Sequence, residues 1–231
     1  MEKTTYKYKA FISYSHRDKK FARWLHKKIE NYKIPKSLRE KYPNLPKDLK
    51  RSIFIDDEEL PTASALPDNL SHALESSELL IVVCSPSASA SYWVDKEIAY
   101  FKHYHGEEKA LAILKEGEPN ATYSTLYENE LEAFPKSLRY KIDKEGNITD
   151  ERTEPLAGDA RRYRGRKKAF IKLIAGILKV DFSDIWEREK RETRKKRFIF
   201  ASVLAVFMAL SIYASMQFII PQEKQTIFKK V

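Results

Sequence analysis

Residues 79–97 have the sequence LLIVVCSPSASASYWVDKE, in which a short apolar run is followed by a polar turn and the start of a helix. The run Leu79–Cys84 predicts a buried strand, and Ser85-Pro86 ends it. A strand, a loop and a helix in this order place side chains at the carboxyl edge of a parallel sheet, where α/β folds bind ligands. This stretch therefore predicts both the fold class and the position of a functional site.

Four further segments are expected to add strands to the same sheet. They are Lys9–Ser15, Ser52–Asp56, Ala110–Leu114 and a short strand near Leu156. Apolar residues recur at helical spacing within 21–29, 68–78, 93–104 and 170–178. Short strands that alternate with amphipathic helices predict a doubly wound parallel sheet of five strands. The proline-containing segments 31–50 and 115–161 are predicted to be a loop or broken helix and a surface excursion, respectively.

The formal net charge of the 231-residue chain is +10, a balance that by itself would favour a nucleic-acid partner. Much of the excess lies in Arg188–Arg197, directly before Phe198–Ile220, which contains no charged residue. This apolar segment has the length of a membrane-spanning helix, and lysines and arginines on its amino side place the N-terminal part in the cytoplasm. A buried core helix and an amphipathic surface helix are the alternatives. Neither fits a segment that is apolar all round.

We therefore expect a single-pass protein of the cell membrane that contacts lipids through residues 198–220 and binds no nucleic acid. The expected boundaries are 1–180 for the α/β domain, 181–197 for a basic juxtamembrane helix, 198–220 for the transmembrane helix and 221–231 for a short polar tail. The polar N-terminus does not have the pattern of a signal peptide. Cys84, inside an apolar run, is expected to be a buried side chain in a reducing compartment.

Trp93 and Glu97 are four residues apart, so they share one face of the predicted helix. An indole can stack on a flat ring and can also keep a neighbouring carboxylate partly desolvated, which suits a binding and acid–base pair. Spacing alone leaves two alternatives open. Glu97 can be a solvated residue that pairs with Lys96 or favours the helix N-terminus, and Trp93 can be ordinary packing.

The acidic run Asp56–Glu59 allows a magnesium site, or a phospho-acceptor pocket like that of receiver domains with Lys115 at the end of the fourth strand. Receiver domains do not have a helix with the Trp93–Glu97 pattern, so the receiver-like interpretation is the weaker one. His103 and His105 lie on different faces of a helix and are poor joint ligands, so we expect no metal site. The basic cluster Arg161–Lys168 is expected to be a solvated helix face, with lipid headgroups as the alternative partner.

Three segments, in this order, resemble the conserved boxes of Toll/interleukin-1 receptor (TIR) domains. Lys9–Asp18 resembles the first box, and Phe54–Leu60 resembles the second strand with the start of its loop. Ser85-Pro86 followed by Trp93–Ile98 resembles the end of the third strand and the Trp-x-x-x-Glu helix of the family. The tail 173–189, with its basic residues and apolar span, is similar to bacterial TIR proteins anchored in a membrane. The resemblance implies the flavodoxin-like fold already predicted from the strand and helix pattern.

The resemblance also implies an enzyme that cleaves NAD+ at the nicotinamide–ribose bond, as a hydrolase or an ADP-ribosyl cyclase. Glu97 falls on the catalytic glutamate of the family. The substrate-binding positions implied in the same way are Trp93, Tyr14, Ser15, Arg17 and Asp56. NAD+ is then a substrate, and no cofactor is expected. Departure of nicotinamide leaves a cation-like ribosyl centre that a carboxylate can stabilise, so no Ser or Cys nucleophile is required.

By the same resemblance, we expect activation by assembly with other TIR protomers, in bacterial antiviral defence or signalling. The rival interpretation is a non-enzymatic TIR scaffold that signals through contacts between TIR domains. Trp93 and Glu97 favour the enzyme. The loop Leu60–Leu66 lacks the glycine and following aromatic residue often found in the family, and its role in gating or assembly stays open.

Overall fold

The computed structural model describes residues 6–56, 66–123, 131–153, 155 and 157–228. The chain divides into two units, Met1–Phe182 and Ser183–Val231, and each is considered by itself. The first unit contains the sheet, and the second consists of most of one long helix.

Five parallel strands form the sheet of the first unit, in the order β2-β1-β3-β4-β7. Their bounds are β1 Ala10–Ser13, β2 Ile53–Ile55, β3 Leu80–Cys84, β4 Ala110–Leu114 and β7 Ala157–Asp159. In the register, Phe11 lies beside Phe54 and Leu80, and Leu80 lies beside Ala110. This confirms the predicted doubly wound parallel sheet. Its order reverses between β1 and β3, the place where such folds bind ligands.

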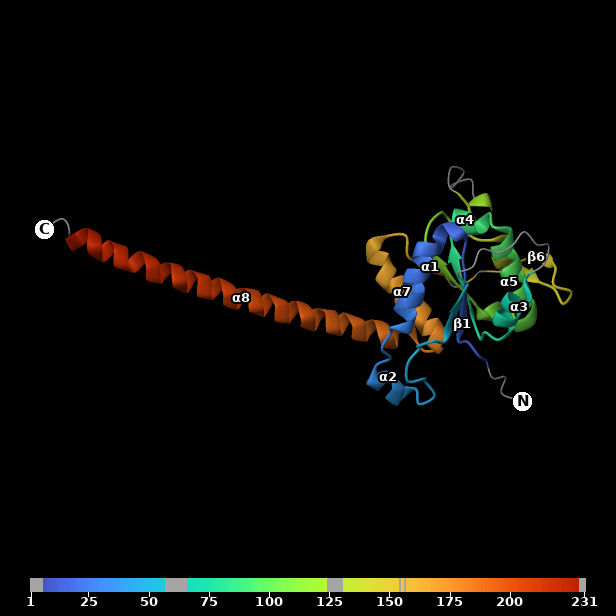
Figure 1. Ribbon diagram of the computed structural model, residues 1–231, viewed down its shortest axis with the longest axis horizontal. Helices are drawn as coiled ribbons and strands as arrows, with labels where there is room; N and C mark the ends of the chain where they lie inside the picture. The colour runs from blue at the N-terminus through green and yellow to red at the C-terminus, as the bar shows by residue number, and fades with distance from the viewer. Residues whose placement is uncertain (1–5, 57–65, 124–130, 154, 156, 229–231) are drawn as a thin grey trace. The chain divides into compact units, whose positions relative to one another are not determined.

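Helices cover both faces of the sheet. Their bounds are α1 Lys19–Glu30, α2 Lys36–Lys41, α3 Asp68–Glu75, α4 Pro86–Ser89, α5 Tyr92–His105, α6 Lys136–Arg139 and α7 Tyr163–Leu178. Short 3-10 turns lie at His16–Asp18, Glu107–Lys109 and Ala121–Tyr123. Figure 1 shows α1 and α7 on one face and α3 and α5 on the other. With both faces covered, β3 is buried along its whole length, which explains its continuous apolar sequence.

Two serine caps connect β3 to α5. The Ser85 hydroxyl accepts a hydrogen bond from the Ala88 backbone N–H at 3.0 Å, and Pro86 occupies the first turn of α4. The Ser91 hydroxyl accepts a hydrogen bond from the Val94 backbone N–H at 3.4 Å and begins α5. Such caps satisfy N–H groups that have no partner inside the helix. They place the first turns of α5 directly after the carboxyl end of β3.

The segment 115–161, predicted to be a surface excursion, instead contributes to the core. Ala133, Phe134 and Leu138 are buried in the same cluster as Ile98 and Phe101 of α5. The segment also contains an antiparallel hairpin of β5 Tyr140–Ile142 and β6 Ile148–Arg152. These elements are too short and too polar to give a clear periodic signal, and their apolar side chains are separated by loops.

The long helix α8 extends from Phe182 to Phe228. Within it, Phe182–Ser215 is long and apolar enough to cross a membrane by length and composition alone, with a mean hydropathy of 2.2 in a window that has no buried residue. The helix continues without a break through the boundaries expected at 198 and 221, which stay predictions, as do the membrane location and orientation.

Candidate functional site

Glu97 is buried where α5 passes the end of β1. Its side chain is 6% exposed, and the Ser13 hydroxyl, on a residue that is 1% exposed, donates a hydrogen bond to Glu97 Oε2 at 2.5 Å. Ser13 is the last residue of β1, so this contact lies at the carboxyl edge beside the switch point of the sheet. The alternative of a solvated glutamate is therefore wrong.

Burial raises the pKa of Glu97 to about 8, with a further upward contribution from the negative charge of Asp56, while the Ser13 hydrogen bond acts in the opposite direction. The carboxyl group is therefore mostly neutral at pH 7. A cation placed next to it would favour the ionised form. A buried ionisable group of this kind beside a ligand-binding edge is typical of a functional site.

Tyr14 and Asp56 join the ends of β1 and β2 at the same edge. The Tyr14 hydroxyl donates a hydrogen bond to the Asp56 backbone carbonyl at 2.5 Å. Asp56 follows β2 directly, and its charge acts on Glu97. The structure thus brings Tyr14, Asp56 and Glu97 together, although they are far apart in the sequence.

An ion pair between the buried Asp18 and the partly exposed Lys115 holds the loop that follows β1. Asp18 is 1% exposed, and it accepts hydrogen bonds from the Ser85 hydroxyl at 2.5 Å and from Lys115 Nζ at 2.7 Å. These contacts attach the His16–Asp18 turn to the ends of β3 and β4. Lys115, which the receiver-like alternative would need for a phospho-acceptor, is therefore occupied by Asp18. Sequence reasoning missed this role of Asp18, whose partners are 67 and 97 residues away.

Ser15 and Arg17 lie on this anchored loop. Ser15 precedes the 3-10 turn and its backbone carbonyl accepts a hydrogen bond from the Asp18 N–H at 2.6 Å, while Arg17 is exposed. Within the described part of the chain, neither side chain hydrogen-bonds to Glu97. Their implied contact with a nucleotide stays a prediction.

Trp93 forms part of the wall of a cavity of about 480 Å³ on the outer side of α5. The lining residues are Leu66, Ser71, Trp93, Lys96, Ala99, Tyr100, His103, Tyr104, Glu145 and Gly146. The Trp93 ring also contacts the Tyr92 ring, edge to face, at a centroid distance of 5.5 Å. Trp93 and Glu97 are one helical turn apart, yet Glu97 is not among the described residues that line this cavity, because its side chain is turned toward β1.

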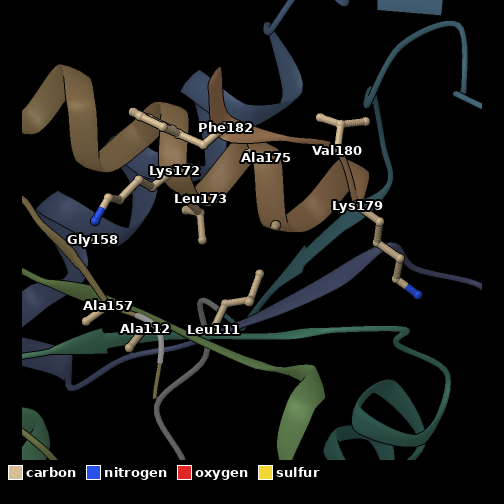
Figure 2. Close-up of a pocket in the computed structure, with 11 residues that line it drawn as sticks. Leu111, Ala112, Ala157, Gly158, Lys172, Leu173, Ala175, Lys179, Val180 and Phe182 are labelled. Atoms are coloured by element: carbon tan, nitrogen blue, oxygen red, sulfur yellow. The ribbon is translucent and has the colours of Figure 1, made fainter. Parts of the chain in front are cut away.

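A second cavity, of about 410 Å³, lies between α7 and the β4–β7 edge of the sheet (Figure 2). Its walls are mainly apolar, and Leu111 and Leu173 face each other across it. Two lysines also line it: Lys172 lies on α7, and Lys179 follows the last residue of α7. Lys179 forms an ion pair with Glu78 at 2.8 Å. None of the residues predicted for the functional site lines this cavity.

Among the described residues, no group of three or more His, Cys, Asp and Glu side chains is placed to hold a metal ion. Residues 57–59 of the acidic run and residues 60–65 of the following loop lie outside the described part, so the magnesium alternative and the role of that loop are not decided. Cys84 is buried, as expected, and burial raises the pKa of its thiol.

Comparison with known proteins finds similarities to a sequence family, to an NAD(+) hydrolase and to solved structures. The sequence model of a family described as TIR domain matches residues 10–140. The NAD(+) hydrolase ApTIR of Actinoplanes sp. (strain ATCC 31044 / CBS 674.73 / SE50/110) is 27% identical over 212 residues, which cover 88% of this chain and 28% of that protein. The TIR domains in the structure of the activated Roq1 resistosome, directly recognizing the pathogen effector XopQ, are 21% identical, with 46% of this chain and 55% of that chain covered and a TM-score of 0.30. The match thus spans only a part of the length of ApTIR.

Proposed function

Because the chain belongs to the TIR domain family, whose sequence model matches more than half of it, we propose that it cleaves NAD+ at the nicotinamide–ribose bond. The observation that carries this proposal is the buried Glu97 carboxyl group, which Ser13 holds at the carboxyl edge of the sheet. The 27% identical relative, an NAD(+) hydrolase, supports the same reaction.

In the proposed reaction, the bond between the nicotinamide nitrogen and the ribose carbon breaks, and neutral nicotinamide leaves with the bonding electron pair. The ribosyl centre becomes cation-like, and the Glu97 carboxylate stabilises it. Water then adds to this carbon and loses a proton, giving ADP-ribose. If a ring nitrogen of the adenine adds in place of water and the adenine loses a proton, the product is cyclic ADP-ribose, which contains one water molecule fewer than ADP-ribose.

The raised pKa of Glu97 fits this sequence of steps. The nicotinamide ring of NAD+ carries a positive charge that is lost when the bond breaks, and the ribosyl centre then becomes positive. Either charge next to Glu97 favours its ionised form. The carboxylate would thus form when the substrate or the transition state is present. A scaffold that acts only through contacts between TIR domains gains nothing from an acidic group whose burial disfavours its charge.

The proposed function also includes anchoring in a membrane and activation by assembly with other TIR protomers. Phe198–Ile220 would anchor the protein in the cell membrane, with the TIR domain in the cytoplasm. Confinement to a bilayer raises the local concentration of neighbouring domains without any new contact, which favours assembly with other TIR protomers. Such assembly would switch on NAD+ cleavage, in bacterial defence or signalling.

The test uses the purified full-length protein in lipid vesicles, incubated with NAD+ at several protein densities. Chromatography should show nicotinamide in equal amount to the sum of ADP-ribose and cyclic ADP-ribose. Glu97→Gln should release nicotinamide only at the background rate, whereas Glu108→Gln, the same change at an exposed position after α5, should keep the parent rate. If the parent releases no nicotinamide at any density, the proposed function is wrong.

A further inference from the structure

Helix α1 presents a stripe of basic residues to solvent. One side of the helix is apolar and buried, and it consists of Ala22, Leu25 and Ile29. The exposed residues on the other side are three or four positions apart and therefore share one helical face: Lys20, Arg23, Trp24 and Lys27. The segment 19–29 contains no Asp or Glu. The exposed side of α1 is thus positively charged along its length, with an indole in the middle.

Helix α7 widens this stripe into a face. The segment 160–180, which includes α7, also contains no Asp or Glu. Its exposed basic residues include Arg166, Lys167, Lys168 and Lys172. Helices α1 and α7 cover the same face of the sheet (Figure 1), and the Lys28 ammonium group of α1 lies 4.6 Å from the centre of the Phe170 ring of α7. These exposed residues of the two helices together form the basic face of the domain.

Trp24 is held at the surface of the basic face. It is 36% exposed, and its ring lies 5.2 Å from the Phe21 ring. The Lys28 ammonium group, which also contacts α7, lies 4.7 Å from the centre of the Trp24 ring. A solvated helix face needs no exposed indole. An indole among lysines and arginines is typical of surfaces that bind a bilayer, because the ring is favoured at the level of the headgroups and the cations attract anionic lipids.

We propose that the basic face docks on the surface of a membrane that contains anionic lipids, with Trp24 at the level of the headgroups. The inference rests on the membrane anchor of the proposed function and is independent of NAD+ cleavage. Only residues 179–181 separate α7 from α8, which contains the segment long and apolar enough to cross a membrane. The anchor would keep the basic face within reach of the bilayer, so a weak attraction is sufficient for docking.

Docking would also limit the orientations of the domain. All docked domains present the same side to the bilayer, and neighbouring domains then differ mainly by rotation in the plane of the membrane. Fewer orientations raise the effective concentration of the correct one, which favours contacts between protomers. The lipid composition of the membrane thereby becomes a factor in assembly, since the attraction depends on anionic headgroups.

The test uses the full-length protein in vesicles of phosphatidylcholine, with or without phosphatidylserine. Both kinds of vesicle contain a lipid that is brominated close to its headgroup and quenches nearby tryptophans. The emission of Trp24 is the difference between the parent and Trp24→Phe, since Trp93 and Trp186 are present in both proteins. This emission should be quenched about twofold or more in phosphatidylserine vesicles at low salt. The quenching should be lost at high salt and in vesicles of phosphatidylcholine alone.

A pair of double variants tests the charges. Lys27→Gln with Lys168→Gln removes one charge from each helix of the basic face. The ratio of docked to undocked domains, obtained from the quenching as the phosphatidylserine content is raised, should fall about thirtyfold. Lys136→Gln with Lys144→Gln is the matched control and should leave this ratio unchanged. These two lysines are also exposed, but they lie on α6 and in the β5–β6 turn, elements that contact α5 on the other face of the sheet.

Four outcomes would overturn the inference. They are no quenching of Trp24 in phosphatidylserine vesicles, equal quenching in vesicles of phosphatidylcholine alone, an equal loss of docking in both double variants, and a Trp24 emission that responds to duplex RNA but not to phosphatidylserine. The last result would assign the basic face to nucleic acid. Failure of the anchor is seen separately, as loss of the protein from phosphatidylcholine vesicles during an alkaline wash, and quenching of Trp24 in phosphatidylserine vesicles still decides whether the basic face docks.

Discussion

Replacing Glu97 by Gln should make the folded protein more stable at alkaline pH, in addition to its effect on chemistry. The pKa of this group is 4.5 in an unperturbed chain and about 8 in the folded protein. Because the folded-state pKa is the higher one, the stabilising contribution is fully present below pH 4.5 and is lost as the pH rises through 8. A glutamine does not titrate, so the variant avoids this loss.

The size of the effect follows from the pKa difference. Each unit corresponds to 1.36 kcal/mol, so the parent should lose on the order of 4 kcal/mol of unfolding free energy between pH 4.5 and pH 9, relative to the variant. For a domain of this size, that difference corresponds to roughly 10 °C in Tm. The assay is thermal unfolding of both proteins, followed by tryptophan fluorescence at intervals from pH 5 to pH 9.

The difference in Tm between Glu97→Gln and the parent should be small at pH 5, should grow up to about pH 8 and should then level off. Glu78→Gln is a control of opposite sign. Hydrogen bonds and charges from Lys179 and Lys9 lower the pKa of Glu78 below its usual value despite the opposing effect of burial. Glu78→Gln should therefore be less stable than the parent at pH 7, with a difference that shrinks at acid pH. A Glu97→Gln difference that stays constant with pH would refute the conclusion that Glu97 is a buried titrating group.

Three further predictions concern binding, the active carboxylate and the membrane. Trp93→Ala should weaken binding of a non-cleavable NAD+ analogue by about 1–3 kcal/mol while Trp93→Phe keeps most of the affinity, and equal affinities of all three proteins would make Trp93 a packing residue only. Ser13→Ala removes the hydrogen bond that lowers the Glu97 pKa, so the pH profile of kcat/KM for NAD+ should move to higher pH; an unmoved profile would contradict this role. Deletion of residues 198–231 should release the protein into the soluble fraction and lower NAD+ consumption in cells, and forced oligomerisation should restore it. A truncated protein that stays in the membrane fraction, or that consumes NAD+ fully as a dilute monomer, would contradict the anchor or its role in activation.

The strands β1, β3 and β4 were predictable from the sequence because each is a short apolar run that the fold buries along nearly its whole length. Leu80–Cys84 is the clearest case, and polar residues follow it immediately. For the site, the sequence predicted only which strand ends meet at one edge of the sheet. Parallel strands bring the ends of β1, β2 and β3 to one edge, and therefore bring Ser13, Asp56 and Trp93–Glu97 near one another.

Burial depth and long-range polar pairs were not predictable. Helical spacing places Glu97 beside the apolar face of α5 but does not say that Ser13 meets it there. Lys102 on the same helix is also buried, with its ammonium group 3.0 Å from the Tyr140 carbonyl and 2.5 Å from Glu107, although a lysine in a polar helix is expected to be solvated. Such partners come from separate loops, and no periodic pattern connects them.

The most direct test of the account is the rate of the chemical step itself, measured with the protein in excess over NAD+ and at a concentration well above the Kd, so that nearly every substrate molecule is bound. Glu97→Gln keeps a hydrogen-bond acceptor for Ser13 but removes the charge that would stabilise the ribosyl cation. Nicotinamide release by this variant should be slower than by the parent by about 10²–10³-fold or more, with ADP-ribose affinity retained. Nicotinamide release at the parent rate from a fully bound Glu97→Gln protein would show that Glu97 is not the catalytic residue.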